Sequence, residues 1–252
     1  MKKYVNLFVF VFMIGACLSQ GRAQTKSAVS YKNPVVDIAM PDPTVIKATD
    51  GYFYVYATES TRNVPIMKSK DLVEWTYCNT AFTNKTRPRF EPKAGIWAPD
   101  INYINGKYVL YYAMSVWGGE QTCGIGVATA NSPQGPFTDH GKMFRSNEIG
   151  VQNSIDPSLL QYEGRNYLVW GSFRGIYVIE LTADGLSIMS GAKKKRIAGT
   201  AFEAVYIHKH GDYYYMFASI GSCCQGVKST YKVVVGRSKK VWGLSLIHIS
   251  EP

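Results

Sequence analysis

Three acidic residues stand at matching places in a repeated pattern and could carry acid–base chemistry. Asp42 and Asp156 each precede a proline and open a short apolar segment, and Glu203 opens a similar segment. An ionised carboxylate can activate a water molecule, while a protonated carboxyl can donate its proton to a leaving oxygen. Asp-Pro is also a common turn element. Because all three acids occupy matched positions, the sequence nevertheless predicts a catalytic set.

The strands that must position these acids come from a pattern that occurs four times. Each copy has an apolar strand, a turn at a glycine and a second strand rich in aromatic and β-branched residues. The copies start at Asp42, Ala98, Asp156 and Glu203, and their turn glycines are Gly51, Gly106, Gly164 and Gly211. A period of roughly 50 residues, built from short strands without a helical pattern, is typical of a β-propeller with one four-stranded blade per repeat.

The predicted fold is therefore an all-β propeller with about four blades in this chain. The first strand of each blade lines the central channel, so equivalent positions on different blades meet around one axis. Third strands are expected at residues 64–72, 124–130, 175–181 and 230–238. No fourth strand is recognisable after Ser238, so the fourth blade is expected to be unfinished.

The first residues predict export. Lys2 and Lys3 precede an apolar run at residues 7–14, which is too short for a membrane span and is typical of a bacterial secretory signal. Cleavage after Ala23 would remove residues 1–23 and leave an incomplete propeller domain at residues 24–240. An alternative is a lipid on Cys17, because residues 14–17 resemble a lipoprotein box. The protein is thus expected in the periplasm, outside the cell, or on the outer membrane.

The chain is basic, with a net charge of +10, but its charge is scattered. The exception is the run of four cations at residues 193–196, which is expected to form a solvated loop between the third and fourth repeats. No nucleic-acid-binding motif accompanies this run, so nucleic acid is not an expected partner.

Four cysteines remain after the signal, at Cys78, Cys123, Cys223 and Cys224. Export permits disulfides, but the spacing does not determine their pairing. The adjacent Cys223 and Cys224 predict a tight loop. No second closely spaced cysteine pair is present, so a zinc site is not expected.

Four motifs, in order, resemble glycoside hydrolase family 43, which has a five-bladed propeller fold. They are Pro41-Asp42-Pro43, Trp97-Ala98-Pro99-Asp100, Ile155-Asp156-Pro157-Ser158 and Glu203-Ala204-Val205-Tyr206-Ile207. The stretch at residues 223–231, with Val235-Gly236-Arg237-Ser238, narrows the resemblance to endo-α-1,5-L-arabinanases and extends it over residues 34–240. Val205 departs from the pattern, because the family more often has proline there.

The resemblance implies a role for each acid. Asp42 would be the general base and Glu203 the general acid of an inverting hydrolase, with their carboxyl groups roughly 6.5–9.5 Å apart. Asp156 would modulate the pKa of the acid and orient the sugar. The implied substrate is arabinan or a related plant cell-wall polysaccharide. The chemistry needs no cofactor, although the family's arabinanases often hold a channel calcium with a histidine from a further blade.

Aromatic residues at the channel mouth are the next candidates, because sugar rings stack on aromatic faces. Trp97 and Trp117 occupy places where the resemblance implies substrate contacts, although packing between blades is an alternative for both. Tyr54, Tyr111 and Tyr214 alternate within strands and are expected in the core. His208 and His210 share a strand face, but their place beside a hairpin turn does not favour a metal site, and none is predicted.

Other functions remain open. A β-xylosidase or an exo-acting α-L-arabinofuranosidase of the same family would share the three acids, and a non-catalytic carbohydrate-binding propeller would be expected to lack them. Residues 241–252 resemble translated cloning or adapter sequence and are expected to stand outside the native fold.

Overall fold

The computed structural model describes residues 31–242, which form four antiparallel β-sheets. Blade 1 comprises β1 (Thr44–Lys47), β2 (Phe53–Tyr56), β3 (Pro65–Ser69) and β4 (Trp75–Thr80). Blade 2 comprises β5 (Gly95–Ile104), β6 (Lys107–Ser115), β7 (Gly124–Ala130) and β8 (Thr138–Arg145), followed by the short helix α1 (Ser146–Ile149). Blade 3 comprises β9 (Ser158–Tyr162), β10 (Arg165–Trp170), β11 (Ile176–Glu180) and β12 (Lys195–Ala198). Blade 4 comprises β13 (Glu203–His210), β14 (Tyr213–Ile220) and β15 (Lys232–Ser238), with the 3₁₀ turn η1 (Gly226–Lys228) before β15.

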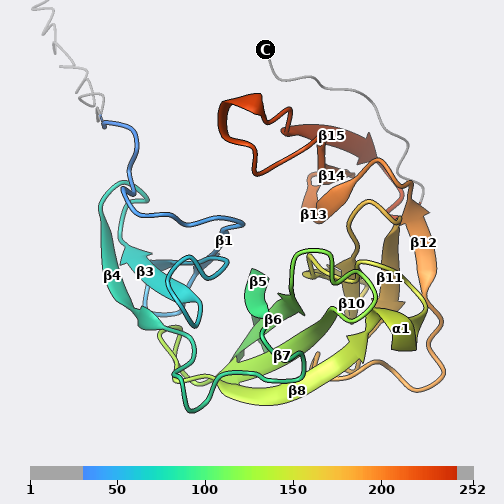
Figure 1. Cartoon of the computed structure of the whole chain (residues 1–252), viewed down its shortest axis with the longest axis horizontal. Helices are drawn as coiled ribbons and strands as arrows, with labels where there is room; N and C mark the ends of the chain where they lie inside the picture. Colours follow the sequence, from blue (N-terminus) through green and yellow to red (C-terminus); the bar gives the residue numbers. More distant parts are fainter. Residues whose placement is uncertain (1–30, 243–252) are drawn as a thin grey trace, which may run out of the picture. The chain divides into compact units, whose positions relative to one another are not determined.

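The four sheets have a propeller arrangement, which confirms the predicted fold class. Strands pair in chain order within each sheet, and the first strands of successive blades contact one another. In Figure 1 the first strands β1, β5 and β13 lie toward the middle, whereas β4, β8 and β12 lie at the periphery. The predicted third strands are β3, β7, β11 and β15, and blade 4 has three strands within residues 31–242. The loops at the start of each inner strand therefore belong to one end of the channel.

Glycine turns join the first and second strands of every blade. Asn105 and Gly106 have φ angles of 48° and 79°, and Glu163 and Gly164 have φ angles of 49° and 73°. Two consecutive positive φ values are the requirement of a type I′ turn, which matches the twist of an antiparallel hairpin. The turn glycines used to align the repeats thus occupy the predicted hairpins.

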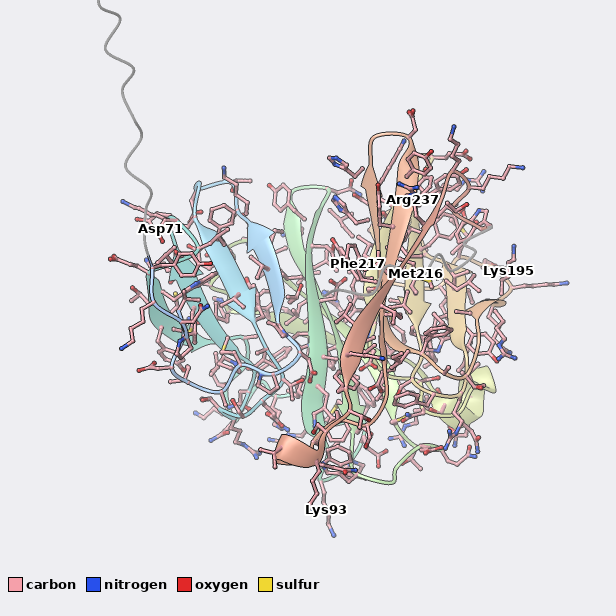
Figure 2. All side chains as sticks on the ribbon, turned by 90° about the horizontal axis from the view of Figure 1, so that it is seen from above. Asp71, Lys93, Lys195, Met216, Phe217 and Arg237 are labelled. Carbon is pink, nitrogen blue, oxygen red and sulfur yellow. A yellow bond between two sulfur atoms is a disulfide. The ribbon has the colours of Figure 1, made fainter. Side chains whose placement is uncertain are left out.

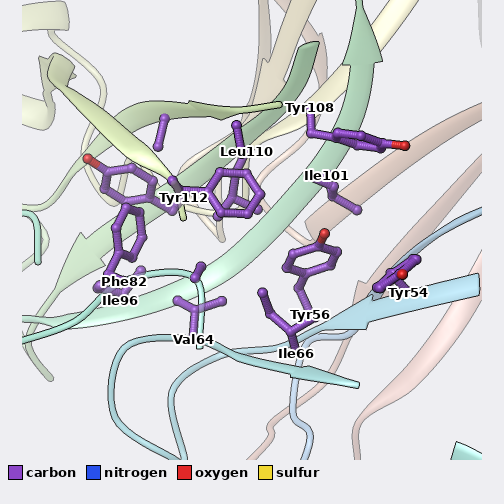
Figure 3. Packing of buried hydrophobic residues seen from close by; sticks show 14 of the residues in the cluster. Tyr54, Tyr56, Val64, Ile66, Phe82, Ile96, Ile101, Tyr108, Leu110 and Tyr112 are labelled. Carbon is purple, nitrogen blue, oxygen red and sulfur yellow. The ribbon is translucent and has the colours of Figure 1, made fainter. Parts of the chain in front are cut away.

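The core lies between neighbouring blades rather than within one sheet. Between blades 1 and 2, Tyr56, Ile66 and Tyr112 pack with no exposed surface, as Figure 3 shows. Separate clusters lie between blades 2 and 3 and between blades 3 and 4. The three tyrosines predicted in the core are buried: Tyr54, Tyr111 and Tyr214. Because each blade covers its neighbour, the blades fix one another's position around the channel.

Two sequence boundaries need correction. The basic run was expected to be a loop, but Lys195 and Arg196 belong to β12, because pairing with β11 extends through them. Residues 241–252 were expected to stand outside the native fold, but the first two of them pack against the propeller. Val241 is buried in the core between blades 3 and 4, and the Trp242 ring packs against Tyr162 at 5.7 Å between ring centroids.

Some sequence-based expectations lie outside the described residues. These are the signal at residues 1–23, the lipid on Cys17 and residues 243–252 of the tail. Within residues 31–242, no helix has the length and apolar character needed to cross a membrane.

Candidate active site

The start of every inner strand has the same unusual backbone conformation. Asp42, Ala98, Asp156 and Ala204 have φ angles of 50°, 41°, 57° and 52°. Positive φ is uncommon for residues other than glycine. Its recurrence at one position in all four blades identifies these four residues as structural equivalents.

This equivalence corrects the alignment of Glu203. In blade 2, one extra residue is inserted in β5 between Trp97 and Asp100, and in blade 4 one is inserted in β13 between Glu203 and Tyr206. Glu203 is therefore equivalent to Trp97, and Ala204, not Glu203, matches Asp42. A β-bulge re-aims side chains next to it. For this reason the acid of blade 4 lies one position before the acids of blades 1 and 3.

Asp42 is exposed and is held by a hydroxyl from its own blade. Thr58 Oγ1, just after β2, donates to Asp42 Oδ2 at 2.5 Å. Thr58 Oγ1 also accepts the backbone N–H of Ala98 at 2.7 Å. Thr58 therefore links the carboxylate of blade 1 to the inner strand of blade 2 and leaves the other carboxylate oxygen open to solvent.

Glu203 is buried and is held by blade 3. Ser172 Oγ donates to Glu203 Oε2 at 2.6 Å, and these two residues also form an isolated β-bridge. A second contact joins the same two blades, in which Ser158 Oγ donates to the backbone oxygen of Val205 at 2.6 Å. The position of this carboxyl group is thus determined by contacts between two blades.

Asp156 interacts electrostatically with both of the other acids. Its withdrawal from solvent raises the pKa of its carboxyl well above the usual range, and the charges of Glu203 and Asp42 raise it further. The backbone N–H of Ala204 opposes this rise. Nearby negative charges raise the pKa of a carboxyl group, because they disfavour its ionised form. The structure thus brings Asp42, Asp156 and Glu203 into one electrostatic environment, while their individual roles stay predictions.

Asp100 is a fourth carboxylate, for which the sequence predicts no role. It is buried, and its Oδ2 accepts the backbone N–H of Leu159 and the side-chain amide of Asn102, each at 2.7 Å. A longer contact of 3.5 Å joins Oδ1 to the Thr44 hydroxyl. Burial raises the pKa of Asp100 to about 6, against these hydrogen bonds. Asp100 therefore connects blade 2 to the strands that follow Asp42 and Asp156.

Tyr231 is another residue that the sequence did not single out. It follows the loop that contains the Cys223–Cys224 disulfide, and its hydroxyl lies beside Ser219 and Glu203. Burial raises the pKa of Tyr231, the Glu203 carboxylate adds to this rise, and Ser219 opposes it. The predicted tight loop at these cysteines thus reaches the neighbourhood of the acids. Cys78 and Cys123 are free.

Trp97 and Trp117 form an aromatic pair, and Trp97 packs against a small cluster that includes Ile155, the residue before Asp156. The ring centroids of the pair are 5.5 Å apart with the planes inclined by 51°, and Trp117 is 78% exposed. Trp97 lies over Gly95, where any side chain would collide with the indole nitrogen. An exposed indole suits the stacking of a sugar ring.

No metal site is apparent in the described part of the chain. His208 stacks on Tyr206 with ring centroids 6.5 Å apart, and residues 31–242 contain no group of three or more potential ligands arranged to hold a metal ion. The channel calcium that the resemblance implies stays a prediction, and no chemical step is assigned to one.

A propeller whose inner strands bring three acids into one electrostatic environment has the carboxyl groups that glycoside hydrolysis requires. The chain belongs to the glycosyl hydrolases family 43, whose family model matches residues 31–248. It is 37% identical over 215 residues to the extracellular endo-alpha-(1->5)-L-arabinanase 1 of Bacillus subtilis, covering 80% of this chain and 66% of that protein. It is 35% identical over 230 residues to an extracellular exo-alpha-(1->5)-L-arabinofuranosidase of Cellvibrio japonicus, covering 80% of this chain and 65% of that protein.

Solved structures agree with the fold. The Cellvibrio cellulosa alpha-L-arabinanase complexed with arabinohexaose superposes with a TM-score of 0.72 at 31% identity, covering 82% of this chain and 72% of that one. The chain spans 66% and 65% of the two curated relatives named above, slightly less than two thirds of their length.

Proposed function

We propose that the protein is an inverting glycoside hydrolase that cleaves α-1,5-linked L-arabinan. The observation that carries this proposal is that Asp42, Asp156 and Glu203 stand at, or one residue before, the equivalent positive-φ position that starts the inner strands of three blades. The charges of Glu203 and Asp42 also raise the pKa of Asp156, so the three acids lie close enough to interact. The names of the relatives, among them an endo-arabinanase from Bacillus subtilis, support arabinan as the substrate.

Each acid has surroundings that suit a separate step. Asp42 is exposed, and its one hydrogen-bonded oxygen leaves the other free to take a proton from an attacking water. Glu203 is buried and fixed by Ser172, so it can place a proton on the leaving oxygen from a defined direction. Opposite positioning of base and acid across the bond produces inversion.

Asp156 keeps a proton available at the acid side of the site. Burial and the charges of Glu203 and Asp42 raise the pKa of Asp156, so its carboxyl group favours the protonated form. A protonated Asp156 would supply a proton beside Glu203, on the side of the leaving group. The Ala204 N–H donates to the Asp156 carboxylate and helps to orient it.

Exo action is the second candidate. The Cellvibrio japonicus relative is named an exo-acting arabinofuranosidase, and it shares nearly the same identity with this chain as the Bacillus protein does. The endo interpretation is preferred, because more of the arabinan-related names are endo-acting. β-Xylosidase activity has no support from the named relatives.

Export is part of the proposal. Two relatives are named extracellular, which agrees with the predicted signal at residues 1–23. Attachment through Cys17 remains an alternative that the labelling of cells with a radioactive fatty acid would test. A non-catalytic sugar-binding propeller is disfavoured because all three acids are present and coupled.

The test is hydrolysis of linear α-1,5-arabinan by the purified chain, with products followed by chromatography and their anomeric form by NMR. Short oligosaccharides of mixed length would support endo action, and a single small product would support exo action. Glu203→Gln keeps the size and the Ser172 hydrogen bond of the side chain but cannot donate the proton, so turnover should be lost while arabino-oligosaccharide binding persists. Unchanged hydrolysis by this variant would refute the assignment.

A further inference from the structure

A cationic hollow lies between blades 1 and 2, outside the acid cluster. Its volume is about 410 Å³, within the range of small-molecule sites. It is lined by Arg62, Arg87, Pro88, Arg89, Glu91, Pro92, Lys93, Ala94 and Met114. The acids and aromatic pair described above do not include any of these residues.

The charges lining this hollow do not cancel. Arg87 forms a buried ion pair with Glu59, and Glu91 is engaged by Arg145 at 2.7 Å. The remaining three cations are Arg62, Arg89 and Lys93, and none of them forms an ion pair with a carboxylate within residues 31–242. The hollow therefore presents an uncompensated positive charge.

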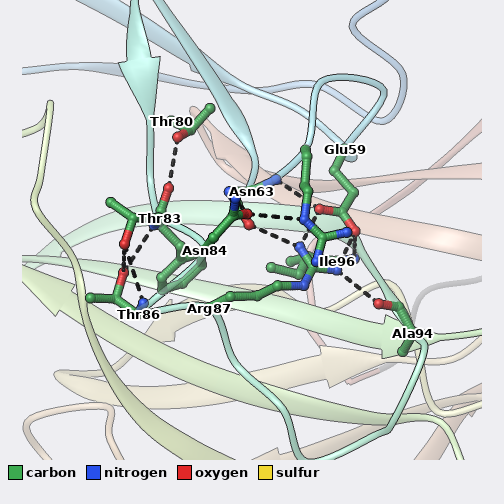
Figure 4. A network of polar contacts seen from close by, with 11 residues as sticks. Glu59, Asn63, Thr80, Thr83, Asn84, Thr86, Arg87, Ala94 and Ile96 are labelled. Atoms are coloured by element: carbon green, nitrogen blue, oxygen red, sulfur yellow. Dashed lines mark hydrogen bonds and ion pairs between the residues drawn. The ribbon is translucent and has the colours of Figure 1, made fainter.

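Both arginines are held in place by one residue. Arg62 Nε donates to the side-chain oxygen of Asn84 at 3.1 Å, and an Arg89 terminal nitrogen donates to the Asn84 backbone oxygen at 3.0 Å. Asn84 in turn belongs to the polar network around Arg87, as Figure 4 shows, and accepts from Asn63 at 3.2 Å. Guanidinium groups that are already ordered lose little entropy on binding, and their remaining donors match the planar fork of a carboxylate.

The hollow adjoins the aromatic pair. Ala94, which lines it, accepts a hydrogen bond from Arg87 at 2.8 Å, and the next residue, Gly95, lies beneath the Trp97 indole. In Figure 2, Lys93 lies at one end of the sheets, away from Asp71, Lys195 and Arg237. Ala94 and Gly95 thus join the lining of the hollow to the backbone beneath Trp97. Pro92, which lines the hollow and is exposed, supplies apolar surface for a sugar ring.

We infer that Arg62, Arg89 and Lys93 form a subsite for a carboxylate-bearing saccharide, a uronic acid residue, next to the Trp97 end of the candidate active site. The inference rests on the proposed function in that it makes the ligand a saccharide, but it requires no turnover. It gives the chain a means of holding an acidic polymer while a neutral chain lies along the acids.

Binding of polygalacturonate to the purified chain tests this subsite, with the fully methyl-esterified polymer as the uncharged control. Because two charge-assisted bidentate contacts are lost, Arg62→Ala with Arg89→Ala should weaken binding of the acid form about tenfold or more. Lys193→Ala with Lys194→Ala removes the same charge from exposed positions beside β12 and should leave binding unchanged. Added salt should weaken binding of the acid form alone.

Equal binding of the esterified and acid polymers would overturn the inference, as would an equal loss in the Lys193 and Lys194 variant. Dextran sulfate competing as well as polygalacturonate would also overturn it, because the hollow would then bind polyanions of any kind. Arg62→Lys with Arg89→Lys keeps the charge and the fold but not the planar fork, and should weaken binding severalfold. Binding is measured without hydrolysis, so a failure of arabinan cleavage leaves this result readable.

Discussion

The hydroxyl of Thr58 donates to Asp42 Oδ2 at 2.5 Å while it accepts the Ala98 N–H at 2.7 Å. One side chain thus orients the proposed base of blade 1 against the backbone of blade 2. Neither contact can be made by an apolar side chain of the same shape. Thr58 is therefore a positioning residue, acting through Asp42.

Thr58→Val should lower kcat about tenfold or more, because a hydrogen bond to a charged group is lost and the Ala98 N–H is left without its acceptor. The KM should change little, since Thr58 is assigned no contact with the sugar. Steady-state kinetics on linear arabinan would measure both. Thr58→Ser keeps the hydroxyl and should restore most of the activity; equal kcat in the Val and Ser variants would argue against a positioning role.

The propeller itself could be predicted because its signal is repeated four times. Each repeat contains the same local features, such as a hairpin glycine like Gly106 and a tyrosine in the second strand like the buried Tyr111. The exact register could not be predicted in the same way. Aligning Glu203 with Asp42 overlooked the bulge after Glu203, and an inserted residue has no local sequence mark when both flanking segments are apolar.

The partners of the acids were also beyond the sequence. Ser172 meets Glu203, and Asp100 meets Leu159, across blade boundaries that only the folded propeller creates. One signal was available: Thr58 and Ser172 each stand two residues after the end of an aromatic second strand. A hydroxyl at that place in two blades could have been read as a contact to the channel.

Asp100 should make stability depend on pH. Its pKa is raised to about 6 in the folded chain, from 3.8, so the folded state binds more protons than the unfolded state between these values. Stability is then fully present below the unfolded pKa and falls as pH rises through about 6, by about 3 kcal/mol for this group.

Asp100→Asn keeps an oxygen that can accept the Leu159 N–H but does not ionise in this window. Chemical denaturation at a series of pH values should show the variant gaining on the parent chain as pH rises from about 4 to about 7. The difference between the two chains isolates Asp100 from other titrating groups, including Asp156. A constant difference across this range would contradict the prediction.

The ion pair between Arg87 and Glu59 should be essential for the loop before β5. The side chains are 7% and 10% exposed, and Glu59 also accepts the backbone N–H groups of Asn63 and Ile96 at 2.8 and 2.9 Å. Burial opposes ionisation of Glu59, but these bonds and Arg87 together lower its pKa. Its contribution to stability is therefore present above the unfolded pKa and lost as pH falls through the lower folded value.

Arg87→Met should destabilise the chain by about 3–5 kcal/mol, because it leaves a buried carboxylate without its partner. Thermal or urea unfolding would measure this loss. Combining it with Glu59→Gln removes both charges but keeps a side-chain oxygen that can accept a backbone N–H, and should cost less than the single change. A double variant that is less stable than Arg87→Met would contradict this prediction. It would show that the Glu59 carboxylate contributes to stability even without Arg87.

Trp117 should affect substrate affinity rather than the chemical step. Its ring is 78% exposed and lies 5.5 Å from Trp97, so the pair offers a stacking surface that costs nothing to uncover. Trp117→Ala should raise the KM for arabinan roughly threefold to tenfold with kcat nearly constant, because an aromatic stacking contact is worth about 0.5–1.5 kcal/mol. Tyr77→Ala removes another exposed ring, from β4 at the periphery, and should leave both constants unchanged. A fall in kcat at constant KM would contradict this prediction. It would show that Trp117 contributes only in the transition state.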